Sequence, residues 1–368
     1  MNDSWNWQAD NLDRYRMNDV KGRQMQIEVV NPSRDPRWDD KLHAFDQATI
    51  FHTSDWARVI QRAYGYATVY LLGNSNGNRM ALMPLFHINS VLTGRRGVSL
   101  PFTDQCAPLF SDDSSGDRLI EKAVAIGQHK KWRSLEIRGG EYFLQKQIVP
   151  SDIFYTHQLD LAGDEQTVQA KFRSSTRRNI KKAVKADLQP SISHTFSDVD
   201  AFYQLNCLTR RDHGLPPQPL SFFRHLYDVL IEKRKGFVVL VRHKGKVIAG
   251  AVYLLYRDQC MYKYGASDKR YQNLRANNLV MWSAIQWCIQ NQFRRFHFGR
   301  TELQHEGLLQ FKRGWGTTEQ KAYYYKYNFK SQDFEARPAR IKSSYFVFER
   351  LPIPILTLIG RLLYRHVG

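Results

Sequence analysis

Cysteine is scarce in this chain of 368 residues, and long hydrophobic runs are missing. The four cysteines are Cys106, Cys207, Cys260 and Cys288. They lie far apart, without the Cys-x-x-Cys or Cys/His spacing of a zinc site, and argue against a disulfide framework. No stretch approaches the ~18–20 apolar residues of a membrane-spanning helix, and the longest, Leu351–Ile359, contains two prolines. These absences favour a reducing compartment, so we expect a cytoplasmic protein without a bound metal.

Acidic residues are also few beside the basic ones. There are 35 Asp and Glu against 54 Lys and Arg, which gives a formal net charge of +19. Such an excess favours a polyanionic partner: nucleic acid, an acidic membrane surface or a phosphorylated substrate. The chain is nevertheless 42% apolar and 13% aromatic, so it can bury sizeable cores and is not disordered as a whole.

Helical and strand-like patterns alternate along the chain and predict an α/β (or α+β) fold. Gly65–Ile88 resembles Gly236–Tyr256, and Leu135–Gly139 resembles Arg295–Gly299, at an offset of roughly 160–170 residues. This repetition indicates a tandem duplication; the alternative is two domains that share generic strand-turn-strand patterns. We expect a flexible leader, two domains and a basic amphipathic tail, at residues 1–24, 25–155, 156–330 and 331–368.

Several local patterns are clear enough to predict single elements. Helices are expected at Phe51–Gly65 and Thr167–Ala186, a strand at Ser134–Arg138, and a hairpin from Phe237–Arg242 and Lys246–Tyr256.

Four motifs of the second half carry a resemblance to a known family. They are FRSSTRRNIKKAVK (Phe172–Lys185), RRDHGLPPQP (Arg210–Pro219), YGASDKRYQNLRANNLVMW (Tyr264–Trp282) and HFGRTELQHEGLLQFKRGWG (His297–Gly316). In this order they resemble the FemAB-related branch of the GNAT acyltransferases. That branch includes the Fem-type transferases that add amino acids to peptidoglycan precursors, and FemAB-like proteins found beside exopolysaccharide and PEP-CTERM systems.

The resemblance implies two tandem GNAT-like domains, each a mixed sheet flanked by helices. It also implies transfer of an acyl or aminoacyl group to an amine of a peptidoglycan stem peptide or an exopolysaccharide aminosugar. A GNAT domain binds the pyrophosphate of coenzyme A with a glycine-rich turn at a helix start. The corresponding Arg270–Asn277 contains no glycine. This favours aminoacyl-tRNA over acyl-coenzyme A as donor, and both stay open; no tightly bound cofactor is expected.

Lys312 matches the lysine of the Fem-type F-K-x-x-(F/W)-G motif, in which it stabilises negative charge at the reacting ester. Phe311 would form a wall beside it. Glu302 follows a strand end and would orient Lys312 or act as base, and Asp104 would hold the acceptor amine. The alternative for Lys312 is an ordinary surface lysine. For Glu302 it is a structural ion pair near the strand end, and for Asp104 it is an aspartate that caps a turn. No Ser/His/Asp or Cys/His motif is evident, so we expect direct attack without a covalent acyl-enzyme.

Arg177, Arg178 and Lys181 share one face of a helix with further lysines. Like charges at this spacing destabilise a helix, so the ridge favours an anion opposite it, and Fem-type relatives use an arginine here on a diphosphate. A solvated basic face is the alternative.

Three further residues are candidates for substrate binding. Arg300 would grip a phosphate or a carboxylate. Tyr264 would point into the donor cleft between two strands, with core packing as the alternative. His213 lies in a turn and could act as a base, although a turn histidine bonded to the backbone explains it equally well.

The tail Tyr345–His366 mixes apolar and basic residues, which is typical of a helix lying on an anionic membrane. A helix packed on the second domain is the alternative. We therefore expect a lipid-linked or phosphorylated precursor as partner. Aminoacyl-tRNA is one of the two donors considered, and the inner face of the membrane is one of the locations considered within the cytoplasm. The alternative function is a non-catalytic GNAT-like protein that binds nucleic acid or serves as a scaffold.

Overall fold

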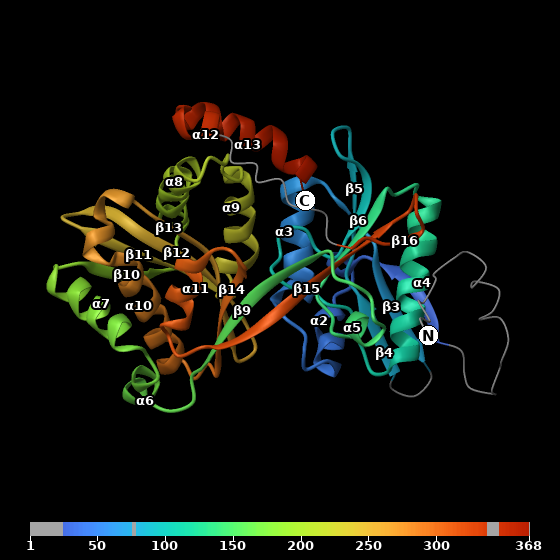
Figure 1. Ribbon diagram of the computed structural model, residues 1–368, viewed down its shortest axis with the longest axis horizontal. Helices are drawn as coiled ribbons and strands as arrows, with labels where there is room; N and C mark the ends of the chain where they lie inside the picture. Colours follow the sequence, from blue (N-terminus) through green and yellow to red (C-terminus); the bar gives the residue numbers. More distant parts are fainter. Residues whose placement is uncertain (1–24, 76–78, 337–345, 368) are drawn as a thin grey trace.

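The computed structural model describes residues 25–75, 79–336 and 346–367 (Figure 1). Two sheets organise the chain. The small one has four strands in the order β1-β3-β4-β7. These strands are β1 (Gln26–Val30), β3 (Tyr70–Ser75), β4 (Arg79–Met83) and β7 (Leu109–Phe110).

The large sheet has 12 strands and runs through both halves of the chain, in the order β10-β11-β12-β13-β14-β9-β15-β8-β6-β5-β2, with β16 paired to β15. Its strands are β2 (Ala67–Thr68), β5 (Phe86–Ser90), β6 (Gly94–Val98), β8 (Ser134–Arg138), β9 (Asp152–Asp160), β10 (Gln189–Ser193), β11 (Gly236–His243), β12 (Lys246–Tyr256), β13 (Gln259–Ser267), β14 (Arg295–Glu302), β15 (Thr318–Asn328) and β16 (Asp333–Phe334).

Helices cover the sheets and connect their strands. The longer ones are α3 (Ser54–Tyr64), α4 (Asp113–His129), α6 (Glu165–Ala170), α7 (Ser174–Lys185), α8 (Phe196–Asp212), α9 (Leu220–Leu226), α10 (Ala276–Gln290), α11 (Glu306–Arg313) and α13 (Ile353–Val367). The short ones are α2 (Trp38–Lys41), α5 (Tyr142–Gln145) and α12 (Phe346–Arg350), the 3-10 turns η1 (Pro32–Arg34), η2 (Leu42–Ala44), η3 (Ile50–His52) and η5 (Lys269–Leu274), and the π-helical η4 (Tyr227–Ile231). No helix among the described residues is both long and apolar enough to cross a membrane.

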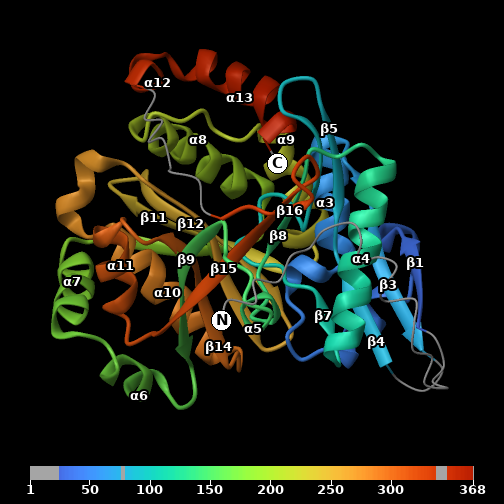
Figure 2. The same cartoon turned by 45° about the vertical axis from the view of Figure 1, so that its right-hand side comes forward.

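The order of elements repeats between the halves. The succession α4–β8–α5–β9 in the first half has its counterpart in α10–β14–α11–β15 in the second. Strands β9 and β15 cross diagonally between the two halves (Figures 1 and 2). β9 pairs with β14 and β15, and β15 continues onto β8. The expected domain boundary at residues 155/156 therefore falls inside β9, whose partner strands β14 and β15 both belong to the second half.

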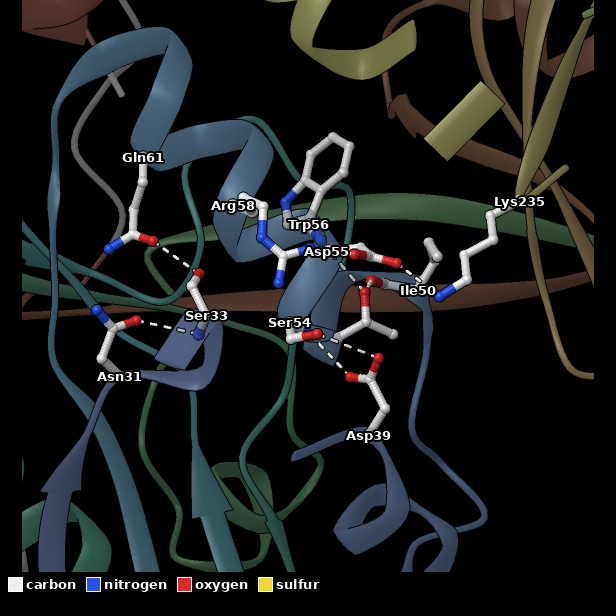
Figure 3. A network of polar contacts seen from close by, with 11 residues as sticks. Asn31, Ser33, Asp39, Ile50, Ser54, Asp55, Trp56, Arg58, Gln61 and Lys235 are labelled. Carbon is white, nitrogen blue, oxygen red and sulfur yellow. Dashed lines mark hydrogen bonds and ion pairs between the residues drawn. The ribbon is translucent and has the colours of Figure 1, made fainter. Parts of the chain in front are cut away.

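The start of α3 ties the two halves together (Figure 3). Thr53 caps the helix through Trp56 N–H, and Asp39 accepts hydrogen bonds from both the backbone and the hydroxyl of Ser54. Asp55, almost fully buried, accepts from Lys235 of the second half at 2.6 Å. The core continues across this contact, because the rings of Trp56 and Phe222 lie 6.4 Å apart within one apolar cluster.

Most predicted elements are confirmed, including the strand Ser134–Arg138 and the hairpin of β11 and β12. The single helix expected over Thr167–Ala186 is wrong, because the chain forms α6 and α7 with a break between them. Phe172 at the break is buried against the rings of Trp282 and Trp315. The extended backbone of Arg173 donates its N–H to Gly314 instead of continuing the helix. Long-range packing, which periodicity does not reveal, determines this break.

Candidate functional site

A β-bulge in β14 is the foundation of the candidate site. The pairing of β14 with β9 shifts register between His297 and Arg300. Gly299 within the bulge has a φ of +67°, a left-handed conformation that glycine adopts without steric cost. The bulge interrupts the ladder, and the carbonyl groups of Gly299 and Arg300 both accept hydrogen bonds from the side chain of Lys312.

Lys312 reaches the bulge from α11, and its side chain is buried. Its Nζ lies 2.9 Å from the Gly299 carbonyl oxygen and 3.2 Å from that of Arg300. Burial lowers the pKa of Lys312 to about 8, although the carboxylate of Asp104 opposes the shift. The site therefore holds a buried ammonium group whose charge is marginal at mildly alkaline pH.

Asp104 faces the bulge from the first half of the chain. A Cβ atom on Gly299 would lie 3.2 Å from its Oδ2, a contact so tight that the carboxylate would have to shift by a few tenths of an ångström. The same Oδ2 lies 3.4 Å from Nζ of Lys263, a buried residue of β13. Burial lowers the pKa of Lys263, and Asp104 raises it. One carboxylate thus faces two buried amines, Lys263 and Lys312.

Arg300 is held against an aromatic wall. Its guanidinium donates to the Tyr324 hydroxyl at 2.8 Å and lies 4.3 Å from the centre of the Phe154 ring. The Tyr324 hydroxyl in turn donates to the backbone carbonyl of Asp104. Burial raises the pKa of Tyr324 to about 12, although Arg300 and Arg138 oppose the shift. Tyr324 therefore connects Arg300 to the backbone of Asp104.

His157 of β9 adds a titratable group to this neighbourhood. Its Nε2 lies 2.8 Å from a carboxylate oxygen of Glu319, which also pairs with Arg313. Its Nδ1 is buried and has no partner in the described part of the chain. Burial lowers the pKa of His157, and the ammonium of Lys312 lowers it further.

The structure thus brings Lys312, Arg300 and Asp104 together, and the catalytic or binding role of each stays a prediction. It adds three residues that the sequence analysis missed: Lys263, Tyr324 and His157. Lys263 is the one charged residue in Cys260–Ala266, and this was its only signal. His157 had none, because the strand that carries it was not recognised.

Two predicted residues lie beside this centre. Phe311 is half-buried on α11, with its ring 5.8 Å from that of Trp315. Tyr264 is partly buried in an aromatic cluster with Phe222 and Phe223. Its ring centre lies 5.3 Å from Nζ of Lys263, so it forms part of the apolar wall around that amine.

The basic ridge lies on α7, at the outer edge of the second half (Figure 1). Arg178 and Lys181 are exposed, and Arg177 donates to the Ala170 carbonyl at 3.3 Å. No described contact joins these side chains to Lys312. The start of α7 is nevertheless adjacent to the end of α11, because Arg173 N–H donates to the Gly314 carbonyl.

Glu302 and His213 are exposed. Glu302 ends β14. His213 follows α8, and partial desolvation, with Lys269 and Arg210 nearby, lowers its pKa. The role of each in substrate binding or catalysis stays a prediction.

Strands β13 and β14 part next to the bulge. They pair in parallel from Gln259–Arg295 to Met261–His297, and beyond these residues β14 stays paired with β9 alone. The glycine-free loop that follows β13 is fixed by Asp268, which accepts two hydrogen bonds from the Arg270 guanidinium. Helix α10 then begins at Ala276, and its N-cap residue Arg275 makes no capping hydrogen bond with its side chain. Among the described residues, no group of three or more His, Cys, Asp or Glu is placed to hold a metal ion.

Comparisons with known proteins agree with this architecture. Residues 170–313 match the family described as acetyltransferase (GNAT) domain. The structure superposes on FemX with a TM-score of 0.64 at 14% identity, covering 83% of this chain and 98% of that one. No curated protein sequence matches the chain significantly.

Two further solved structures share the fold. A tandem GNAT protein from the clavulanic acid biosynthesis pathway has a TM-score of 0.54 at 9% identity, over 83% of this chain and 98% of that one. L-PGS from Bacillus licheniformis has a TM-score of 0.54 at 13% identity, over 93% of this chain and all (100%) of that one. The predicted fold of two tandem GNAT-like units is confirmed.

Proposed function

We propose that this GNAT-type acyltransferase, which has the FemAB-related fold of FemX, passes an acyl or aminoacyl group to an amine of a cell-envelope precursor. The acceptor would be a peptidoglycan stem peptide or an aminosugar of an exopolysaccharide. The fold similarity to the C-terminal domain of a putative lysylphosphatidylglycerol synthetase from Agrobacterium fabrum (TM-score 0.53, 12% identity) supports an acceptor or donor at the cell envelope.

The observation that carries the proposal is the placement of Lys312. An ammonium group has three N–H donors, and two of them bind the carbonyl groups of Gly299 and Arg300. The described residues offer no hydrogen-bond acceptor to the third. A donor that is already fixed in a buried site can stabilise a tetrahedral oxyanion without reorganisation.

The proposed reaction is direct. The acceptor amine attacks the donor carbonyl carbon, a C–N bond forms, and the carbonyl oxygen becomes an oxyanion that Lys312 stabilises. Asp104 accepts the proton that the amine loses and delivers it to the leaving group, as the C–O bond of an aminoacyl ester or the C–S bond of a thioester breaks. Arg300 and Tyr324 hold the backbone of Asp104 in place.

A cysteine acyl-enzyme is not part of this proposal. All four cysteines are buried and unpaired. Burial raises the pKa of the Cys207 thiol to about 11 and that of Cys106 well above its ordinary value, so neither forms a reactive thiolate readily.

We assign the phosphates of the precursor, or of the donor, to the basic ridge of Arg177, Arg178 and Lys181. Its exposure leaves it accessible to a large polyanion. The glycine-free loop before α10 favours aminoacyl-tRNA over acyl-coenzyme A. We place the reaction in the cytoplasm, at the inner face of the membrane.

The test is a label-transfer assay. Purified protein is incubated with either labelled acetyl-coenzyme A or labelled aminoacyl-tRNA, together with amine-bearing nucleotide-linked and lipid-linked envelope precursors. Wild type is compared with Lys312→Met and with Lys321→Met, a matched variant at an exposed lysine of β15. Melting curves verify that each variant is folded.

We expect transfer by wild type and by Lys321→Met, and loss of transfer by folded Lys312→Met. The donor that gives transfer identifies the donor class. Equal label in the product with wild type and Lys312→Met, or none from either donor, contradicts the proposal. In the latter case, RNA binding that disappears when the ridge is neutralised would favour the nucleic-acid-binding alternative.

A further inference from the structure

Six of the ten large apolar side chains that are exposed in the described residues gather on one surface. Four of them belong to α13 and two to the turn between β5 and β6. They are Ile355, Leu358, Leu362, Val367, Val91 and Leu92. Helix α13 and this turn lie side by side along one edge of the molecule (Figures 1 and 2). We name these six residues the apolar edge.

The turn and the helix are joined by several hydrogen bonds. The Ser90 hydroxyl lies 3.0 Å from Nδ1 of His366, and the Thr93 hydroxyl donates to the His366 carbonyl at 2.9 Å. Arg96 donates to the carbonyl groups of His366 and Val367 at the helix end. The β5–β6 turn is therefore fixed against the C-terminal end of α13.

Helix α13 divides cleanly into two faces. Leu356 and Gly360 are buried against the protein, and a Cβ atom on Gly360 would lie 2.0 Å from the Pro217 carbonyl oxygen. Ile355, Leu358 and Leu362 follow one another at helical spacing on the opposite face. Residues on a solvent-exposed helix face are usually polar, so this exposed apolar row indicates an interaction surface.

The charged residues of α13 and of the β5–β6 hairpin are all basic. Arg361 and Arg365 of α13 and Arg95 of β6 are exposed beside it. The sequence has no acidic residue from Leu351 to Val367 or from Phe86 to Thr103. An apolar row flanked by arginines matches the boundary between acyl chains and anionic headgroups of a lipid bilayer. A second copy of the same surface would instead bring like charges together.

We propose that the apolar edge docks this protein on an anionic lipid bilayer, with α13 lying in the membrane interface and the β5–β6 turn inserted beside it. This proposal rests on the proposed function, because docking on the membrane would give the enzyme access to a lipid-linked substrate. The inner face of α13 reaches towards the candidate site: the ring of Tyr364 lies 5.8 Å from that of Phe102, two residues before Asp104. Docking would thus present this side of the site to the membrane.

The test is co-sedimentation of the full chain with vesicles, one set of pure phosphatidylcholine and one containing about one third phosphatidylglycerol. Two paired variants remove the apolar edge, Leu358→Asp/Leu362→Asp and Val91→Asp/Leu92→Asp. The control Val29→Asp/Val149→Asp makes the same change at two apolar residues that are also exposed but lie elsewhere. Arg361→Gln/Arg365→Gln tests the charge.

We expect binding to phosphatidylglycerol vesicles that falls about tenfold or more in each edge variant and stays unchanged in the control. The arginine variant should lose the preference for the anionic vesicles. Absence of vesicle binding, or equal loss in edge and control variants, overturns the proposal. So does a dimer in sedimentation velocity that only the edge variants dissociate, because the occupant is then a second copy.

Failure of the docking surface and failure of the proposed function are distinguishable. Edge variants should transfer label to a water-soluble acceptor at the wild-type rate. Vesicle binding without transfer to any acceptor contradicts the proposed function and leaves the docking surface standing. Transfer to an acceptor without vesicle binding supports the proposed function and contradicts the docking surface.

Discussion

Lys312 donates a hydrogen bond of 2.9 Å to the backbone carbonyl of Gly299, and this contact links α11 to the bulge of β14. The bulge interrupts the pairing of β14 with β9, and the ammonium of Lys312 donates to the carbonyl groups of both Gly299 and Arg300. These two hydrogen bonds also fix the position of the ammonium, and they therefore determine the geometry of the candidate site.

Lys312→Met keeps the volume and apolar stem of the side chain but removes the ammonium. We expect the transfer rate to fall about 10²–10³-fold, the usual effect of losing an oxyanion donor. The free energy of unfolding should fall by about 1–3 kcal/mol, because two carbonyl groups lose their donor. Single-turnover transfer and urea unfolding measure the two effects. A stable variant with the wild-type rate would contradict the role of the lysine.

Gly299→Ala has a matched control in Gly65→Ala. Both glycines have left-handed backbones, with φ of +67° and +71°, so each substitution should cost about 1–2 kcal/mol of stability. A Cβ atom meets nothing within 4 Å at Gly65, but at Gly299 it lies 3.2 Å from Asp104 Oδ2 and from the Tyr262 carbonyl oxygen. We expect transfer to fall at least about tenfold in Gly299→Ala only. Equal transfer rates in the two variants would show that the space between Gly299 and Asp104 is unimportant.

The pH dependence of transfer should report the charge of Lys312. Its pKa is lowered by burial from 10.5 to about 8, so the ammonium form disappears above that pH. We expect the rate to decline above about pH 8 in wild type and to stay level there in Lys312→Arg, whose guanidinium remains charged. The same declining limb in both proteins would assign it to another group.

The same pKa shift predicts an opposite trend for stability. Between about pH 8 and 10.5 the unfolded chain binds the proton of Lys312 and the folded chain releases it. The contribution of this lysine to the free energy of unfolding therefore rises with pH in that window. Urea unfolding of wild type and Lys312→Met, compared at several pH values, should show the rise in wild type only.

Asp104→Asn removes the carboxylate between two buried amines. We expect loss of transfer, and a stability loss of about 3 kcal/mol because the buried Lys263 loses its counter-ion. The double variant Asp104→Asn/Lys263→Met should recover much of the stability and none of the activity. Recovery of transfer in the double variant would mean that Asp104 serves only to neutralise Lys263.

The basic ridge should act on binding and not on chemistry. Arg178→Gln/Lys181→Gln should raise KM for the phosphate-bearing substrate about tenfold, weaken its salt dependence and leave kcat unchanged. Lys122→Gln/Lys321→Gln removes two exposed charges elsewhere and should behave as wild type. A fall in kcat with unchanged KM would place the ridge in a different role.

The sequence predicts the fold class, the repeated order of elements and many of the strands, because apolar periodicity and turn residues are local signals. It indicates Lys312 and Asp104 as candidate site residues through the family resemblance, and Arg300 through its place near a strand end; their roles stay predictions. It does not predict that β9 and β15 join the halves, nor that α7 starts only after Phe172 is buried. Pairing between β8 and β15 brings together residues almost two hundred positions apart, and no local pattern encodes such a contact.

Lys263 and His157 show the same limit at the site. Their chemistry arises from burial beside Asp104 and Lys312, respectively. Burial of a charged group inside a mixed sheet is decided by the neighbouring strands, so the residue type alone gives no indication of it.

The most direct test is a structure of the complex with a tetrahedral phosphonate analogue that joins an acceptor amine to a donor acyl group. The account predicts a phosphonyl oxygen about 2.7–3.1 Å from Nζ of Lys312 and the acceptor nitrogen on the side of Asp104. An analogue bound with its phosphonyl oxygens away from Lys312, while the Lys312 ammonium still contacts only Gly299 and Arg300, would contradict it.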